Sequence, residues 1–438
     1  MHKKMQPHNF SFTIDNQYSL AENIGANGLS DELINQAELS LTKALDKILA
    51  EQEQIKLLNI CDNHDQLLIS QQVAAEIKSK YKKLYIFGIG GSSLGGQTLC
   101  GSKFYQFFNE TNFELVFIDN IHYHNFSIFL EHINYSETAF LTISKSGSTI
   151  ETLAQILVTR DFFAEQIKKF GADNFYFITE HKNSPLVTIA KDMHRPIINH
   201  HPEIGGRYSC FLPVALIPAK LSSCNIVDFV SGGKAVTTEF LQQKNNSFIF
   251  HNAKIILAIM QKGYNNHVFM PYMQRLYQLI YWYAQLFAES LGKDNQGMMP
   301  VKALGSVDQH SLLQLFLAGP KNNFFTFITQ STNNLGNLIK LNPEIKAINY
   351  FQNNSLGDVI NANQEATIET LRQNSIPLRR IHFQHFNDHA LGELMMYFML
   401  ETILLGYALQ LNPFDQPAVE SGKIKAREIL RKKNKLAI

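Results

Sequence analysis

The chain has 438 residues, of which 45% are hydrophobic and 18% charged, a composition that excludes a disordered protein and suits two or three domains. Its 39 basic and 38 acidic residues give a formal net charge of +1, which argues against nucleic acid as a partner because such proteins usually carry a basic excess. Four cysteines without CxxC pairs or zinc-like spacing indicate reduced thiols, as in cytoplasmic proteins.

Short apolar runs rich in β-branched and aromatic residues alternate with longer helical patterns, which predicts mainly parallel sheets flanked by helices. The predicted strands, in chain order, are Leu84–Gly88, Leu115–Asp119, Ala139–Ile143, Phe175–Thr179, His267–Met270, Phe324–Thr329 and Leu378–Phe383. The clearest helical patterns are Thr149–Phe170, Pro271–Leu291 and His389–Leu411.

Two groups of strands separated by helices predict two α/β/α sandwich lobes with a helical C-terminal extension. The expected divisions are an N-terminal helical segment (1–60), a first lobe (61–225), a second lobe (226–411) and a closing C-terminal segment (412–438).

Two features argue against a secreted or membrane-bound protein. The N-terminal MHKKMQPHNF has no apolar run behind its basic residues, so we expect no signal peptide and a cytoplasmic location. The most apolar long stretch, Met395–Leu411, is interrupted by Glu401 and is too short for a span, so we predict a buried core helix and no membrane partner.

A glycine-rich segment, YIFGIGGSSLGG, covers Tyr85–Gly96. A buried strand runs directly into the glycines and a helical pattern follows, an arrangement that brings backbone N–H groups close to an anion. It is neither a Walker loop nor a clean GxGxxG dinucleotide fingerprint. The segment therefore indicates a phosphate or sugar site, with a tight strand–helix turn as the alternative.

A second segment, LTISKSGSTIETLAQ, covers Leu141–Gln155 and also leads from a strand into a helix. Ser148 and Glu151 fit a capping box, which would start the helix there. One cap needs only one hydroxyl, whereas several crowd together here around Lys145. Such a set of donors at a helix N-terminus favours a phosphate.

These two loops, GIGGSS and SKSGST-x-ET, resemble those of the phosphoglucose isomerase family, which has the sugar-isomerase (SIS) fold. Further segments extend the resemblance over roughly residues 60–430 and in the family's order. They are EIGGRYSCFLPVAL (Glu203–Leu216), QLFAESLGK (Gln285–Lys293), GSVDQHSLLQL (Gly305–Leu315) and NPFDQPAVESGK (Asn412–Lys423).

The resemblance implies interconversion of glucose 6-phosphate and fructose 6-phosphate through ring opening and a cis-enediolate, without metal or organic cofactor. It implies that Glu289 is the base, that His310 is the ring-opening acid, and that Arg207 and Lys423 assist the reaction. It also implies a homodimer in which His310 comes from the neighbouring subunit. The substrate-binding residues that it implies are Gly91, Ser92, Ser144, Lys145 (through its backbone), Ser146, Thr149, Gln285 and Gln416.

The residue types suit these roles. Gln285 lies one helical turn before Glu289 on the same face, and the apolar neighbours of Glu289 predict that it is partly buried. An imidazole titrates near neutral pH, which suits a residue that protonates a ring oxygen. A fixed positive charge on Arg207 would act where an enediolate develops.

Three rival readings stay open at this point. A sugar-phosphate sensor on the same fold would lack the base, yet the residues matched to catalysis are all present. An aminosugar-phosphate isomerase that depends on glutamine would need an N-terminal cysteine, and this sequence has none. Mannose 6-phosphate remains a possible side substrate. A metal-dependent isomerase would need a ligand cluster, and the nearest candidate, His200 next to His201, has side chains that would normally point apart.

Overall fold

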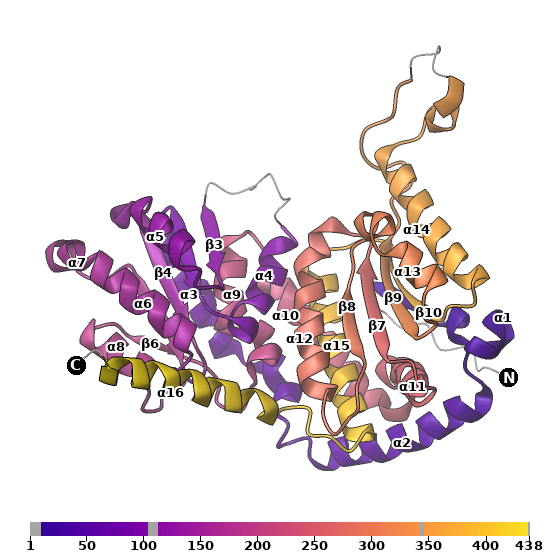
Figure 1. The fold of residues 1–438 in the computed structure, drawn as a ribbon, viewed down its shortest axis with the longest axis horizontal. Helices are drawn as coiled ribbons and strands as arrows, with labels where there is room; N and C mark the ends of the chain where they lie inside the picture. The colour runs from indigo at the N-terminus through magenta and orange to yellow at the C-terminus, as the bar shows by residue number, and fades with distance from the viewer. Residues whose placement is uncertain (1–9, 104–112, 342–345, 437–438) are drawn as a thin grey trace. The chain divides into compact units, whose positions relative to one another are not determined.

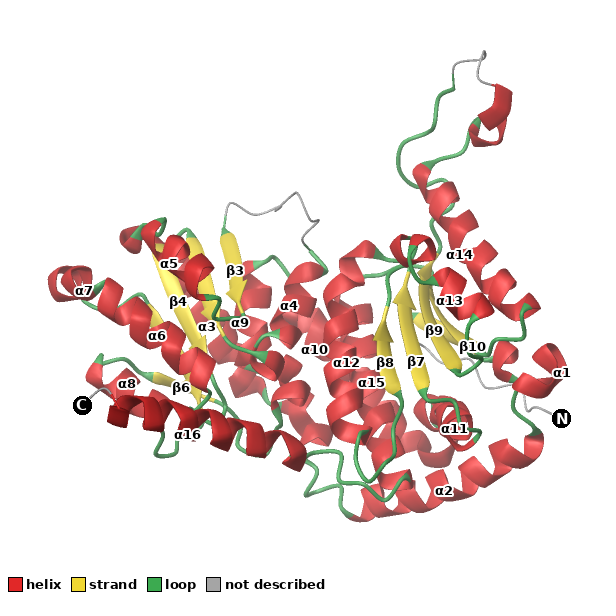
Figure 2. Ribbon diagram, viewed as in Figure 1, coloured by secondary structure: helices red, strands yellow, loops and turns green. Residues whose placement is uncertain are grey.

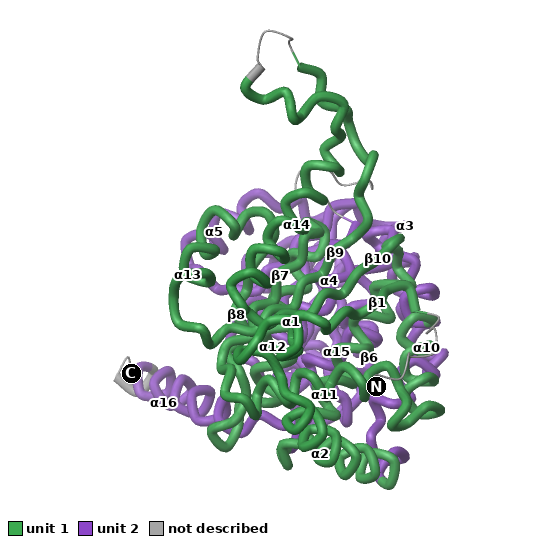
Figure 3. Tube along the Cα trace, turned by 90° about the vertical axis from the view of Figure 1, so that its right-hand side faces the viewer, with its two compact units in different colours: residues 1–50, 231–411 green, residues 51–230, 412–438 purple. Residues whose placement is uncertain are grey.

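The computed structural model describes residues 10–103, 113–341 and 346–436. The chain forms two compact units, each assembled from two separate stretches of sequence (Figure 3). Unit 1 comprises residues 1–50 and 231–411, and unit 2 comprises residues 51–230 and 412–438. Helix α10 (Ile226–Gln243) carries the chain from unit 2 into unit 1.

Unit 2 is built on a parallel sheet of order β3-β2-β4-β5-β6 (Figure 1). Its strands are β2 (Lys83–Phe87), β3 (Glu114–Ile118), β4 (Thr138–Ile143), β5 (Phe175–Thr179) and β6 (Ile197–Asn199). Every residue of the central strands β4 and β5 is buried, as expected for a parallel sheet covered on both faces.

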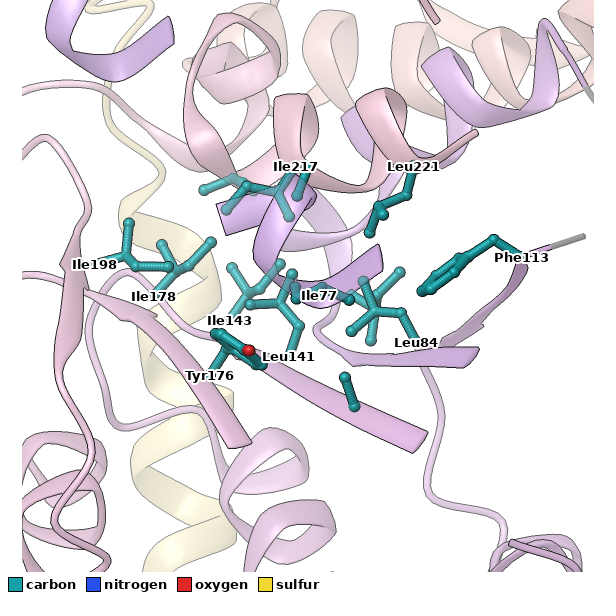
Figure 4. Close-up of a cluster of buried hydrophobic side chains, with 14 residues drawn as sticks. Ile77, Leu84, Phe113, Leu141, Ile143, Tyr176, Ile178, Ile198, Ile217 and Leu221 are labelled. Carbon is teal, nitrogen blue, oxygen red and sulfur yellow. The ribbon is translucent and has the colours of Figure 1, made fainter. Parts of the chain in front are cut away.

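Helices cover both faces of this sheet. On one face Ile77 and Ile217 meet the side chains of the central strands in a buried apolar cluster (Figure 4). On the other face Phe140 and Phe175 stack at 4.8 Å between ring centroids and pack against Ile156. The helices of unit 2 are α3 (His64–Lys80), α4 (Leu94–Gly101), α5 (Tyr123–Glu131), α6 (Ile150–Phe162), α7 (Ala164–Phe170), α8 (Pro185–Asp192), α9 (Pro213–Leu221) and α16 (Glu420–Leu436).

Unit 1 is built on a sheet of order β1-β10-β9-β7-β8. Its strands are β1 (Phe12–Asp15), β7 (Asn266–Pro271), β8 (Met299–Lys302), β9 (Asn323–Gln330) and β10 (Leu378–Phe383). Four of them are parallel, and β1 joins the edge antiparallel to β10. The helices are α1 (Ala21–Ile24), α2 (Asp31–Ala50), α11 (Phe248–Gln261), α12 (Tyr277–Leu291), α13 (Leu313–Ala318), α14 (Leu356–Gln373) and α15 (Asp388–Ala408).

Helix α15 forms the centre of unit 1 and packs against α2, α11 and α12. Within the described chain it is the one helix long and apolar enough to span a membrane, and 94% of its apolar window is buried inside the protein. Its Glu401 is neutralised by Arg379 of β10, whose guanidinium lies 2.5 Å from the carboxylate. The prediction of a buried core helix is therefore confirmed.

The predicted fold class, two α/β/α sandwich lobes with mainly parallel sheets and a helical C-terminal extension, is confirmed (Figure 2). The bounds of two predicted helices are wrong. The helix expected over Thr149–Phe170 is divided at Phe163 into α6 and α7. The helix expected from Pro271 begins at Tyr277, because Pro271 is the last residue of β7.

Candidate active site

The glycine-rich segment leaves the carboxyl end of β2 as a single 3-10 turn, Gly90–Ser92, before α4. Gly90 has a φ of 57°, in the left-handed region that glycine adopts at low cost. A Cβ atom on Gly91 would lie 2.2 Å from the carbonyl carbon of Gly206. The two glycine-containing loops therefore touch through their backbones, and a side chain at Gly91 would push them apart.

The hydroxyl-rich segment leaves the carboxyl end of β4 and leads into α6. Ser144 is buried, and its Oγ lies 2.9 Å from Thr149 Oγ1, whereas Ser146 is exposed to solvent. Gly147, with a φ of 64°, turns the chain tightly against Ser184. Helix α6 begins at Ile150 with Thr149 as its N-cap residue and without a side-chain cap, so the predicted Ser148–Glu151 capping box is wrong. The first N–H groups of α6 thus lack a capping side chain, a setting that suits an anion.

These loops flank the point at which the order of strands reverses. From β2 the chain moves to β3 on one side and then returns to β4 on the other side. Ligands of open parallel sheets bind beyond the carboxyl ends of the strands at such a switch point. The topology of unit 2 therefore places both segments where a ligand is expected.

A charged pair lies beside the hydroxyl-rich segment. Lys145 Nζ is 3.6 Å from Glu180 Oε1, and Lys182 also pairs with Glu180. Burial lowers the pKa of Lys145, and the carboxylate of Glu180 opposes that change. The backbone carbonyl of Lys145 accepts a bond from the N–H of Glu180, which ties the loop after β4 to the loop after β5.

Arg207 is buried, and its guanidinium holds the segment that leads into the C-terminal helix. Its Nη1 donates to Gln416 Oε1 at 2.8 Å, and its Nη2 donates to the carbonyls of Pro413 (2.6 Å) and Asp415 (3.0 Å). Tyr208 also donates from its hydroxyl to Pro413 O. Unit 2 thus brings Arg207, Gln416 and Gly91 together.

Lys423 lies on the first turn of α16 and is exposed. Its Nζ is 2.6 Å from Glu420 Oε1, with both side chains about half exposed to solvent. An exposed pair of this kind contributes little to stability. The lysine is therefore available to exchange this partner for a ligand.

Glu289 and Gln285 lie on the last two turns of α12 in unit 1. Gln285 Nε2 donates to Glu289 Oε1 at 3.0 Å, as the i, i+4 spacing predicts. Their neighbours Leu286 and Phe287 are buried and Glu289 itself is partly buried, so that prediction is confirmed. The other amide atom, Gln285 Oε1, is buried and has no hydrogen-bond partner among the residues that the structure describes. The amide of Gln285 therefore fixes the carboxylate while keeping one acceptor for another group.

His310 ends a 3-10 turn, Val307–His310, that follows β8. Its side chain is exposed, but the turn is anchored on both sides. Asp308 accepts bonds from the N–H of Leu304 (2.7 Å) and the hydroxyl of Ser311 (2.6 Å). Gln309 donates to Thr367 of α14. An exposed imidazole is thus held on a fixed loop.

The topology of unit 1 keeps Glu289 away from His310 of the same chain. Helix α12 leads from the carboxyl end of β7 back to the amino end of β8, so Glu289, in its last turn, lies at the amino edge of the sheet (Figure 2). His310 follows β8 at the carboxyl edge. The length of these strands, roughly 13–20 Å, separates the two residues.

Within the described ranges, no group of three or more His, Cys, Asp or Glu side chains could hold a metal ion. His200 is buried, and its Nδ1 lies 3.0 Å from the carbonyl oxygen of His201. Burial lowers the pKa of His200 to about 4. The adjacent histidines do not form part of such a group.

Comparison with known proteins assigns the chain to a family. Residues 65–437 match the family model described as phosphoglucose isomerase. The chain belongs to the phosphoglucose isomerase family. It is 30% identical to the glucose-6-phosphate isomerase of Carboxydothermus hydrogenoformans (81% of this chain, 80% of the relative) and 31% identical to that of Campylobacter jejuni (81% and 86%).

A solved structure of a glucose-6-phosphate isomerase from Chlamydia trachomatis has the same fold. It superposes with a TM-score of 0.80 at 20% identity, covering 97% of this chain and 89% of the other. Every candidate site residue named from the sequence lies within the stretch that matches the phosphoglucose isomerase model.

Two polar residues that lie beside these segments are not predicted from the sequence motifs. Glu180 follows β5 at the same sheet edge as the two loops, and that shared edge is the signal that would have found it. Arg427 lies one turn after Lys423 and reaches the hydroxyl-rich segment. The i, i+4 spacing from Lys423 places it on the same helix face.

Proposed function

We propose that this chain is a cytoplasmic aldose–ketose isomerase that interconverts D-glucose 6-phosphate and D-fructose 6-phosphate, in glycolysis and gluconeogenesis. The proposal rests on the match of residues 65–437 to the phosphoglucose isomerase family. The matched stretch includes Glu289. Conversion of fructose 6-phosphate to glucose 6-phosphate by the purified chain tests it. The chemistry consists of proton transfers that glutamate and histidine can perform, so the proposal includes no metal or organic cofactor.

The phosphate of the substrate would bind at the hydroxyl-rich segment. Ser144, Ser146, Thr149 and the backbone of Lys145 are the proposed donors, and the N-terminus of α6 adds a favourable field. The half-buried ammonium of Lys145 lies beside them. Support comes from the position of this segment at the switch point of the sheet.

The sugar would contact Gly91 and Ser92, with Gln285 and Gln416 as further contacts. Gly91 has no side chain that would obstruct the sugar, and its backbone is fixed against Gly206. Gln285 Oε1 is a buried acceptor that no described residue satisfies, and a sugar hydroxyl could donate to it. These observations support the assignments that the family resemblance implies.

Glu289 would transfer the proton. In the open-chain aldose, its carboxylate removes the proton from C2, and the electrons move into the C1 carbonyl to give a cis-enediolate. The C2 hydroxyl then passes its proton to the oxygen on C1, the same carboxyl returns its own proton to C1, and the C2 oxygen becomes the carbonyl of the ketose. The bond from Gln285 Nε2, at 3.0 Å, fixes the direction of the carboxylate.

Arg207 would stabilise the negative charge of the enediolate, because its charge is fixed in a buried setting where it acts strongly. Lys423 would act near the ring oxygen. Its present partner, Glu420, is exposed, so little energy is needed to release the lysine.

His310 would open the sugar ring by giving a proton to the ring oxygen. The family resemblance implies that this histidine comes from a neighbouring subunit, and we propose a homodimer on that ground. The separation of Glu289 and His310 across the sheet of unit 1 supports the proposal, because one chain cannot bring both to the same sugar while its sheet is intact.

We expect His310→Ala to slow turnover of closed-ring substrate more than turnover of an open-chain analogue, because only the former needs a proton at the ring oxygen. Steady-state kinetics with both substrates measure the difference. His389→Ala is the control, since His389 is a partly exposed histidine of the same unit that pairs with Glu393. Equal losses on the two substrates would rule out a ring-opening role.

We expect a hybrid dimer of one Glu289→Gln subunit and one His310→Ala subunit to regain about half of the wild-type activity, because one of its two sites would contain both native residues. Two different affinity tags allow the hybrid to be purified and assayed. If each site used Glu289 and His310 from a single chain, each site would carry one defect and the hybrid would stay inactive.

A further inference from the structure

Arg427 is partly buried, whereas the other residues from Ser421 to Lys433 of the C-terminal helix are exposed. Its guanidinium reaches the hydroxyl-rich segment between β4 and α6. Nη2 donates to the carbonyl oxygen of Ser148 at 3.0 Å and to its Oγ at 3.3 Å. Arg427 thus ties α16 to the loop proposed to bind phosphate.

The bond to Ser148 fixes the direction of a short chain of hydroxyl groups. A guanidinium has only donors, so Ser148 Oγ accepts from Arg427 and must donate its own hydrogen elsewhere. It donates to Ser146 Oγ at 3.1 Å, and the N–H of Ser148 donates to the same oxygen at 3.3 Å. Ser146 Oγ, having accepted two bonds, is left to donate its hydrogen outward from an exposed position.

No carboxylate among the described residues forms an ion pair with Arg427. Other basic residues on α16 do have carboxylate partners, Lys423 with Glu420 and Lys425 with Glu428. For Arg427 the bonds within the described chain both go to Ser148. A positive charge without a carboxylate partner, next to the hydroxyl-rich segment, favours the binding of a phosphate dianion there.

We propose that Arg427 is a positioning residue for the phosphate group of the substrate. It directs the hydroxyls of Ser148 and Ser146 so that Ser146 donates to the phosphate, and its charge strengthens that bond. This inference rests on the proposed function, since it assigns the phosphate to the same loop. Arg427 acts through serines that contact the phosphate and not the reacting carbons. It therefore affects the binding of the substrate and not the proton transfer.

The test compares Arg427→Ala with Arg431→Ala, which removes the same charge one turn further along α16 from an exposed arginine. We expect Arg427→Ala to raise the KM for fructose 6-phosphate and the Kd for inorganic phosphate about tenfold each, with kcat changed less than about twofold. Arg431→Ala should change neither constant by more than about twofold. Equal effects of the two substitutions, or a fall in kcat with unchanged phosphate affinity, would overturn the inference.

Two further variants test the chain of hydroxyls. Ser148→Ala should weaken phosphate binding to a similar extent, and adding Arg427→Ala to it should cost little more, because both act through the same bond. Arg427→Lys should bind phosphate more tightly than Arg427→Ala but less tightly than the wild type, since a lysine keeps the charge but lacks the planar set of N–H donors of a guanidinium. Additive effects of the two alanine substitutions on phosphate affinity would contradict the proposed chain of hydroxyl groups.

Phosphate affinity separates this inference from the proposed function. Binding of inorganic phosphate, measured by isothermal titration calorimetry on the full chain, needs no turnover. If the wild-type chain binds phosphate with the expected dependence on Arg427 but does not isomerise fructose 6-phosphate, the proposed function fails and the role of Arg427 stands. If the chain isomerises fructose 6-phosphate but its phosphate affinity does not depend on Arg427, the proposed function stands and the role of Arg427 fails.

Discussion

Replacing Glu289 with glutamine is expected to lower kcat for isomerisation by roughly 10² or more. The substitution keeps the size of the side chain and can keep the contact with Gln285, but an amide cannot accept the C2 proton. Binding of sugar phosphate should be nearly unchanged, because the proposed phosphate contacts lie elsewhere, at the loop after β4. Steady-state kinetics and calorimetric titration with fructose 6-phosphate measure the two quantities separately.

Glu365→Gln provides a matched control for this substitution. Glu365 is another carboxylate of unit 1, on α14, where it pairs with Arg380 at 2.5 Å and is about half exposed. We expect its loss to leave kcat within about twofold, as for other surface carboxylates. A Glu289→Gln enzyme with near-normal turnover would show that another group is the base.

The second large effect concerns stability. In the core of unit 1, Arg379 donates to both oxygens of Glu401 at 2.5 and 2.9 Å, and both side chains are almost fully buried. Burial disfavours the charged form of Arg379, but the carboxylate of Glu401 holds its pKa above the ordinary value. Arg379→Met would leave that carboxylate buried without a counter-charge, although the Tyr397 hydroxyl would still donate to it, so we expect the substitution to lower the free energy of unfolding by about 3–5 kcal/mol.

The neighbouring residue on β10 gives the control. Arg380 points to the other face of the sheet and makes a partly exposed pair with Glu365, so Arg380→Met should cost less than about 1 kcal/mol. Trp282, the single tryptophan of the chain, is buried on α12 and reports unfolding of unit 1 by fluorescence. Adding Glu401→Met to Arg379→Met should restore part of the loss. Equal costs at the two arginines would contradict this account of the core.

The central strands could be predicted from the sequence, whereas the edges of the sheets could not. Strand β5 lies at the predicted residues, because its continuous apolar run is typical of a strand covered on both faces, and β10 also lies at the predicted residues although it carries Arg379 and Arg380. The short strands β1, β6 and β8 were missed. Strand β8 contains Pro300 and Lys302, residues that are unusual in a central strand and tolerated at an edge, and β1 pairs with a strand that is hundreds of residues away in sequence.

The candidate site shows the same division. Its loops could be found because each directly follows a strand, so a local motif placed them at one sheet edge. The contacts that hold them are not local. Arg207 meets Gln416 across 209 positions and Arg427 meets Ser148 across 279, distances over which no periodicity in the sequence is informative. The wrong capping box has the same cause, because the Ser148 hydroxyl bonds to Ser146 and Arg427 instead of capping α6.

The most direct test of the proposed isomerase is a coupled assay with the wild-type chain. Purified protein is given fructose 6-phosphate in the presence of EDTA, and added glucose-6-phosphate dehydrogenase reports the product as NADPH, with Glu289→Gln assayed in parallel. We predict rapid NADPH formation with the wild-type chain and almost none with the variant. Sugar-phosphate binding without product formation by the wild-type chain would contradict the isomerase and favour a sugar-phosphate sensor.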